Sequence, residues 1–438
     1  MKSAILTSLF SLALVASLHA QAKRPSSLLP PRPAPTPPPG AAGVVSSTDW
    51  PGFRGADRSD VSKETGLLKK WPAEGPKKVW MFDGAGLGYS GYSIAGGTLY
   101  TSGARDSEEF LIAVDTATGK EKWSTSIGAL LTNGWGDGPR ATPTVDGDRV
   151  YAMGGKGDLV CVNAKDGKVL WKSSMTAAGG KVPGWGYTES VLVDGKNVIC
   201  TPGGNEGTLL ALDKMTGNKV WQSKEWNDGA QYSSIIPADF NGARQYIQLT
   251  MQNVAGVNAA DGKVLWKAAF PGKTAVIPTP IFKNGQVYVA AGYGVGCKSV
   301  TLGAPGSEPT LAYENTNMVN HHGGVVLVGD YLYGYSDKGG WTCQDFKTGE
   351  VKWAEKGKLK KGAITSADGM LYLLEEDTGT CVLIEASPAG WNEHGRFVIA
   401  PQTTQRNPKG KVWTHPVVSN GKLYLRDQEL LFSYDLKG

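Results

Sequence analysis

Cysteine and histidine are scarce in this sequence, with 5 of each among 438 residues. The cysteines form neither a Cys-x-x-Cys pair nor a Cys-x-x-Cys-His motif, which excludes a short-range zinc knuckle and a c-type haem attachment. Their odd number leaves at least one free thiol or an intermolecular bridge. Because Cys161 and Cys343 hold equivalent places in the repeats described below, we expect them to be small buried apolar residues.

Blocks of like charge and long apolar runs are scarce as well. The 45 basic and 40 acidic residues are mixed along the chain and give a net charge of +5. Without a basic block, a nucleic-acid partner is not expected. Beyond residue 18 no apolar run approaches the length that crosses a membrane. We therefore expect a mature protein that does not span a membrane and that is a monomer.

The N-terminus has the pattern of an export signal. Lys2 precedes an apolar run over residues 4–18, and Ala20 and Ala22 offer a small-residue cleavage site. An uncleaved anchor helix is the alternative, but the run is short for a membrane span. Residues 24–40 are proline-rich and favour an extended spacer. We expect a signal peptide at 1–22, a linker at 23–46 and one domain at 47–438, located in the periplasm or outside the cell.

What the sequence has in abundance is glycine and tryptophan, with 59 and 14 residues. Five segments share one pattern: a strand, an Asp or Asn that opens a turn, a Gly, and a second strand that ends in Trp. The segments are AVDTATGKEKW, CVNAKDGKVLW, ALDKMTGNKVW, GVNAADGKVLW and CQDFKTGEVKW, ending at Trp123, Trp171, Trp221, Trp266 and Trp353. The first four recur every 45 to 50 residues, and the last gap of 87 predicts a degenerate copy within it.

A second hairpin precedes these segments, as at 141–152, 189–200, 278–289 and 414–425. Two hairpins per repeat give four strands, which is one propeller blade. The strand 77–82 (KKVWMF) has no hairpin before it, and the C-terminus ends at YDLKG without its last strand. Pairing the two removes an exposed edge. The sequence thus predicts an all-β, eight-bladed β-propeller of four-stranded antiparallel blades, with an N-terminal strand completing the last blade.

The repeated tryptophans invite two interpretations. A flat ring at one position per blade can pack between neighbouring sheets, with its N–H on a backbone acceptor. A row of rings can also stack on sugars or bases. Because the Trp always ends the outer strand, we expect packing for Trp80 and its five repeats.

In a propeller the innermost strands line a central channel, and the loops that lead into them form a funnel that is the default binding site. The residues that we expect at this funnel are Trp135, Arg140, Trp185, Glu189, Tyr232, His321, His322, Trp413 and His415. Arg140 and Glu189 enter the inner strands of consecutive blades. They form either a ligand-binding pair or a structural ion pair.

His321 and His322 are adjacent in the chain. Since neighbouring residues of a strand point to opposite faces, we expect that both cannot serve one site. A simpler role is to pack a tight Gly-Gly strand start.

The repeats resemble the PQQ-like β-propeller repeat family, part of the quinoprotein alcohol dehydrogenase-like superfamily, over residues 47–438. Segments 50–62, 134–143, 320–334 and 412–427 are similar to a secreted bacterial branch of that family. The resemblance implies PQQ and Ca²⁺ as candidate cofactors, with Ca²⁺ acting as Lewis acid. Oxygen ligands for Ca²⁺ would come from Asp137, Glu189, Glu314 and Asn317.

Two functions follow from the resemblance. One is a binding or scaffold module that takes a small polar ligand, a polymer or a protein at the funnel, similar to the eight-bladed propeller that assists outer-membrane barrel assembly. The other is a PQQ- and Ca²⁺-dependent dehydrogenase acting on an alcohol or a sugar. Such enzymes commonly carry an adjacent Cys-Cys disulfide against the quinone, and this chain has no adjacent cysteines. We favour the binding module.

Overall fold

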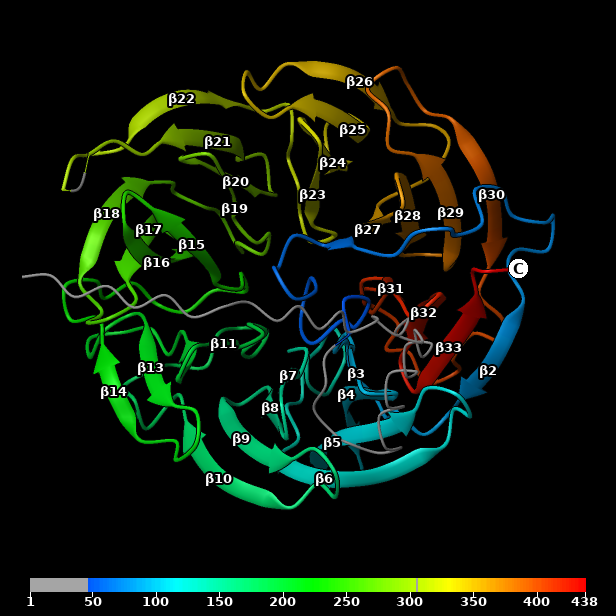
Figure 1. Ribbon diagram of the computed structural model, residues 1–438, viewed down its shortest axis with the longest axis horizontal. Coiled ribbons are helices and arrows are strands. Elements are labelled where there is room, and N and C mark those ends of the chain that lie inside the picture. Colours follow the sequence, from blue (N-terminus) through cyan, green and yellow to red (C-terminus); the bar gives the residue numbers. More distant parts are fainter. Residues whose placement is uncertain (1–45, 305) are drawn as a thin grey trace, which may run out of the picture. The chain divides into compact units, whose positions relative to one another are not determined.

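The computed structural model describes residues 46–304 and 306–438. The expected signal peptide at 1–22 and almost all of the linker at 23–46 lie outside the described residues. The described residues form β-strands, turns and loops without a helix, so none of them builds an apolar helix that could cross a membrane. The strands form eight sheets arranged in a ring (Figure 1). This confirms the all-β, eight-bladed propeller.

Each blade is a four-stranded antiparallel meander whose first strand lies nearest the channel. The first four blades, in chain order, comprise β3 (Ser93–Ala95), β4 (Thr98–Arg105), β5 (Glu108–Asp115) and β6 (Glu121–Ala129); β7 (Thr144–Asp146), β8 (Arg149–Met153), β9 (Asp158–Asn163) and β10 (Val169–Ser174); β11 (Leu192–Asp194), β12 (Asn197–Cys200), β13 (Leu210–Asp213) and β14 (Lys219–Gln222); and β15 (Ile236–Phe240), β16 (Ala243–Leu249), β17 (Asn253–Asn258) and β18 (Val264–Ala269).

The other four blades include the degenerate copy and the closing blade. Their strands are β19 (Ile281–Lys283), β20 (Gln286–Ala291), β21 (Gly296–Thr301) and β22 (Thr310–Asn315); β23 (Val325–Val328), β24 (Tyr331–Ser336), β25 (Gly340–Asp345) and β26 (Val351–Glu355); β27 (Gly362–Ala367), β28 (Met370–Glu375), β29 (Thr380–Glu385) and β30 (Glu393–Val398); and β31 (Val417–Ser419), β32 (Lys422–Asp427), β33 (Leu430–Asp435) and β2 (Lys78–Phe82). A short strand, β1 (Val61–Ser62), adds to β27 in parallel.

The repeated turn joins four blades to the next through one tryptophan and one glycine. Trp171 on β10 donates its indole N–H to the Lys214 carbonyl in the following blade at 3.0 Å. Gly217 of that turn has φ +75°, and a Cβ added there would lie 2.7 Å from the Trp171 ring. Only glycine combines this conformation with such close contact. The corresponding N–H to carbonyl distances are 2.9 Å for Trp80, 3.2 Å for Trp123, 3.1 Å for Trp221 and 2.8 Å for Trp353.

Three blades depart from this pattern of indole N–H to carbonyl bonds, and in one of them the outer strand β30 contains no tryptophan. Trp266 donates to the Gln245 side chain of its own blade at 2.6 Å instead of to a backbone carbonyl. The degenerate blade carries Tyr313 on β22, and its hydroxyl donates to the Phe346 carbonyl of the next blade at 2.9 Å. Tyrosine therefore replaces the missing tryptophan within the 87-residue gap.

Strand β2 lies where the sequence predicts it, as the outermost strand of the last sheet, paired antiparallel with β33. The ends of the chain therefore share one blade. Arg426 on β32 adds bonds across this junction: its buried guanidinium donates to the carbonyls of Ser90 and Ser102, at 2.9 and 2.8 Å. The five cysteines are all free and buried, as expected for small apolar residues.

Candidate ligand-binding site

The segment 50–62 crosses the centre of the ring and forms the floor of the site (Figure 1). Trp50 starts it by bridging to Ile94, and β1 ends it by pairing with β27. The segment is rich in Gly, Asp and Ser and has no apolar periodicity, so it forms successive turns instead of a strand.

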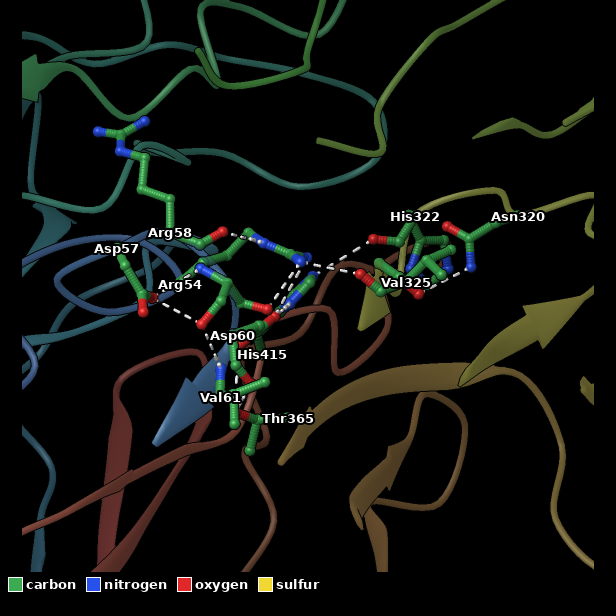
Figure 2. Close-up of polar contacts among 12 residues, drawn as sticks. Arg54, Asp57, Arg58, Asp60, Val61, Asn320, His322, Val325, Thr365 and His415 are labelled. Carbon is green, nitrogen blue, oxygen red and sulfur yellow. Dashed lines mark hydrogen bonds and ion pairs between the residues drawn. The ribbon is translucent and has the colours of Figure 1, made fainter. Parts of the chain in front are cut away.

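Two buried arginines fix this floor segment to the blades. Arg58 donates to the carbonyls of Ser190 and Ile235, both at 2.9 Å, and to that of Val191. Arg54 donates to the Val325 carbonyl at 2.8 Å (Figure 2). Burial lowers the pKa of Arg58 to about 10, so the guanidinium stays charged at neutral pH. A planar cation with several donors satisfies strand ends that would otherwise leave carbonyls unpaired.

Asp60 completes the floor. Its carboxylate lies 3.3 Å from Arg54 Nη1 and accepts a hydrogen bond from the Thr365 hydroxyl at 3.0 Å (Figure 2). His415 Nδ1 lies 3.6 Å from the same carboxylate, and His415 Nε2 lies 3.3 Å from the His322 carbonyl oxygen. The floor is thus a network of polar side chains that bond to one another and to backbone carbonyls of the blades.

Above this floor is a cavity of about 260 Å³. Its walls are mainly aromatic and come from loops of successive blades. The aromatic residues around it include Trp50, Phe53, Tyr89, Tyr92, Trp135, Trp185, Tyr232, Tyr293 and Trp413. Large apolar walls with a few polar groups are typical of small-molecule sites. We call this cavity the funnel.

The structure brings eight of the nine predicted funnel residues together around this cavity. They are Trp135, Arg140, Trp185, Tyr232, His321, His322, Trp413 and His415. The sequence match between Arg140-Ala-Thr-Pro and Trp413-Thr-His-Pro correctly gave these two residues equivalent places on the rim.

Glu189 is the exception, and its expected place was wrong. Thr188 and Ser190 line the cavity, whereas the side chain of Glu189 between them does not. Glu189 is buried, and its carboxylate accepts hydrogen bonds from the Thr201 backbone N–H and hydroxyl, at 2.6 and 2.9 Å. Burial raises its pKa to about 8. It does not pair with Arg140, so the expected structural ion pair is also wrong.

Arg140 is held in place by backbone carbonyls instead. Its guanidinium donates to Gly136 O at 2.7 Å and to Gly138 O, and it lies 5.4 Å from the centre of the Tyr89 ring. Burial lowers its pKa. The cation therefore sits at the cavity wall in a fixed orientation.

The expectation that the two adjacent histidines cannot share one site was wrong. They lie in a turn, because β23 begins only at Val325, so strand alternation does not apply to them. Both line the cavity, with ring centres 5.0 Å apart. His321 Nε2 lies 2.7 Å from the Tyr293 hydroxyl, and His322 Nε2 lies 2.6 Å from Glu376 Oε2.

The four candidate calcium ligands do not meet. Asp137 accepts from the Asn133 backbone N–H at 2.7 Å, Glu314 lies on an outermost strand beside Lys298 at 2.9 Å, and the Asn317 amide donates to the Gly349 carbonyl at 2.9 Å. Glu189 faces away from the cavity. Among the described residues, no three His, Cys, Asp or Glu side chains are grouped so as to hold a metal ion. This donor set does not fit the Ca²⁺ site of a quinoprotein.

Sequence reasoning missed the floor and one carboxylate. Arg54 and Asp60 lie in the segment 50–62, whose signal was visible: a charged, turn-rich stretch that belongs to no repeat. Glu376 follows β28 in a blade without the tryptophan signature, and it binds both His322 and Trp413, at 2.6 and 2.8 Å. No sequence pattern marks it.

Fold and site together define a PQQ-like β-propeller with a closed, aromatic funnel. The family model described as "Outer membrane protein assembly factor BamB" matches residues 107–355, more than half of the chain. The chain therefore belongs to this family of PQQ-like propellers.

Individual relatives are distant. BamB of Burkholderia pseudomallei is 29% identical over 345 residues, covering 73% of this chain and 82% of that protein. BamB of Shewanella oneidensis is 24% identical over 279 residues, covering 62% of this chain, and the chain spans 58% of that protein's length. Quinohemoprotein alcohol dehydrogenase from Comamonas testosteroni superposes with a TM-score of 0.60 at 12% identity, covering 89% of this chain and 81% of that chain. This last likeness concerns the fold alone.

Proposed function

We propose that this chain is an exported binding module and that the funnel is its ligand-binding site. One observation carries the proposal: aromatic rings and a fixed cation, among them Trp135, Arg140, Trp185 and Trp413, reach one cavity from separate loops. The cavity has a floor at 50–62, so a ligand enters from one side. A small polar ligand or the end of a polymer suits such a closed volume.

The exposure of the aromatic walls supports a binding role. Trp135 is 44% exposed and Tyr293 is 37% exposed, whereas the ring tryptophans such as Trp171 are about 8% exposed. Large apolar side chains in contact with water gain free energy when a ligand covers them. Grouped around one cavity, they are more typical of an interaction site than of a core.

The family match covers much of the ring but only part of the funnel. The match over 107–355 includes five blades but neither the floor at 50–62 nor Trp413 and His415. The description as an outer-membrane protein assembly factor therefore suggests a second candidate function, capture of a partner protein by the ring. Crosslinking to an unfolded outer-membrane β-barrel protein tests it, because only this candidate predicts crosslinks on the outer strands.

Calorimetric titration with four probes tests the main proposal: trigalacturonate, maltotriose, PQQ with Ca²⁺, and an extended decapeptide. We expect one small probe to bind with 1:1 stoichiometry. Trp185→Ala and Arg140→Ala should weaken that binding by about tenfold or more, since one buried aromatic or ionic contact is worth at least about 1.4 kcal/mol. Binding that survives both substitutions, or no binding by folded protein, would refute the proposal. PQQ-dependent dye reduction would favour the dehydrogenase instead.

A further inference from the structure

The polar wall of the funnel contains a chain of hydrogen bonds with a fixed direction. Asp337 Oδ1 holds the Lys361 ammonium at 2.6 Å, and Lys361 Nζ lies 3.2 Å from His321 Nδ1. An ammonium only donates, so Nδ1 accepts and the His321 proton is on Nε2. Nε2–H then donates to the Tyr293 oxygen at 2.7 Å. Burial, followed by His322 and Lys361, lowers the pKa of His321 to about 4, in agreement with this neutral ring.

The chain ends in a proton donor. Because Tyr293 accepts from His321, its own hydroxyl proton must point elsewhere, and Tyr293 lines the cavity. Its backbone has φ +57° between Gly292 and Gly294, a conformation that is unfavourable for a bulky residue. A tyrosine at such a strained position points to a role for its side chain.

His322 supplies a second polar group on the same wall. Glu376 Oε2 accepts from His322 Nε2 and from the Trp413 indole, at 2.6 and 2.8 Å. The Glu376 carboxylate occupies Nε2–H, so Nδ1 is the ring nitrogen of His322 that a ligand can bind. Tyr293 and His322 both lie beside His321, with ring centres 4.6 and 5.0 Å from it, so the same wall offers two polar groups to one ligand.

Arg140 adds a cation without a direct ion pair. Its hydrogen bonds go to two carbonyls, and among the described residues the Glu109 and Asp137 carboxylates act on it without forming an ion pair with it. A guanidinium at the cavity wall whose direct partners are neutral can bind an anionic ligand, and its planar fork suits a carboxylate.

The aromatic walls present their faces in several directions. The ring planes of the contacting pair Trp185 and Tyr232 meet at 71°, and those of Tyr89 and Trp413 at 50°. A pyranose can place one C–H face on a single ring and direct its hydroxyls elsewhere.

We propose, building on the proposed binding function, that the funnel recognises an acidic sugar unit of the hexuronate class. Its carboxylate pairs with Arg140, its ring packs on the tryptophans, and its hydroxyls bind Tyr293 and His322. Lys361 is a positioning residue that acts through His321.

Titration of the wild-type protein tests this without any substitution. The probes are trigalacturonate and trimannuronate, each beside its methyl ester, which keeps the ring and removes the charge. We expect the acid of at least one pair to bind about tenfold tighter than its ester, as a charge-assisted hydrogen bond predicts. Equal affinity for acid and ester, or tighter binding of PQQ, would overturn the inference while leaving a binding module.

Variants then assign the contacts. Arg140→Gln should abolish the preference for acid over ester, whereas Arg244→Gln, on an exposed arginine of the ring, should not. Tyr293→Phe should weaken acid and ester alike, and Lys361→Met should do the same although Lys361 does not line the cavity. Lys361→Arg should restore binding. An unchanged preference in folded Arg140→Gln would overturn the inference. Failure of folded wild type to bind any probe would also refute the proposed function.

Discussion

The ring and the funnel use similar residues, but the ring is held by contacts between neighbouring repeats and the funnel by contacts between distant segments. In the ring, Trp80, Trp123, Trp171 and Trp221 each meet a glycine and a carbonyl of the next blade, about 40 residues further along, as for Trp171 and Lys214 at a separation of 43. In the funnel, contacts join distant segments: Arg54 and Val325 are 271 residues apart, and Arg58 and Ile235 are 177 apart. The repeated contacts hold the blades together, whereas the floor of the site depends on contacts that occur only once in the chain.

The same comparison separates two roles of tryptophan. Ring tryptophans have their N–H groups bonded, and four of them, Trp80, Trp171, Trp221 and Trp266, are buried, so their removal should cost stability. Of the funnel tryptophans, Trp135 is exposed and Trp185 and Trp413 are partly exposed, so their removal should cost affinity. The experiments below test that division, starting with the ring.

Deletion of residues 77–82 should have the largest effect. It removes β2, exposes the edge of β33 and deletes the Trp80 bond to the Thr116 carbonyl. An open sheet edge invites association with other chains. We expect loss of folding or aggregation, measured by size-exclusion chromatography and thermal melting. A monomer with an unchanged melting transition would show that the ring does not depend on this strand.

Trp171→Ala should come next. Removing a large buried aromatic residue costs about 3–5 kcal/mol, which urea denaturation can measure. Probe affinity should not change in protein that still folds. Gly217→Ala provides a matched test of the same contact, since its Cβ would lie 2.7 Å from the ring in a strained conformation. Weaker ligand binding without loss of stability would show that Trp171 contacts the ligand and does not serve to pack the blades.

The sequence predicted the ring well because its signal is local and repeated. Trp, Gly and turn Asp recur in register, so blade number and the closing strand could be derived from spacing. The degenerate blade was located, but its tyrosine was not identified, because Tyr313 lacks the flanking Gly-Lys pattern of the repeats.

The funnel was predicted only in part because side-chain direction depends on backbone that leaves the repeat. Arg140 and Trp413 follow the repeat and were placed correctly. The two histidines were misjudged because β23 starts three residues after His322. Glu189 was misjudged because its carboxyl group is bonded by Thr201, a contact that the local repeat pattern does not encode. The floor at 50–62 makes contacts that no local pattern encodes.

Glu189→Gln should change the pH dependence of stability moderately. Burial raises the pKa of Glu189 from 4.5 to about 8, so the folded protein holds a proton that the unfolded chain releases. Stability of the wild type should therefore fall as pH rises from about 4.5 to about 8, at up to about 1.4 kcal/mol per pH unit. Denaturation at pH 5 and pH 8.5 should show a smaller difference for the variant. Identical pH profiles would mean that Glu189 is not held neutral.

Trp185→Ala should have the smallest effect on stability and a clear effect on binding. Its ring packs edge-on against Tyr232 at the cavity wall, so we expect a loss of less than about 1 kcal/mol on unfolding. Affinity for the bound probe should fall about tenfold. Urea denaturation and calorimetry on the same sample measure both. A large loss of stability with unchanged affinity would place Trp185 with the ring tryptophans.

A crystal structure of the complex with the tightest-binding probe tests the central claim most directly. We predict one ordered ligand in the funnel, above the Arg54–Asp60 floor, in contact with Arg140 and Trp185. A ligand ordered on the outer strands of the ring, with the funnel free of it, would contradict the account.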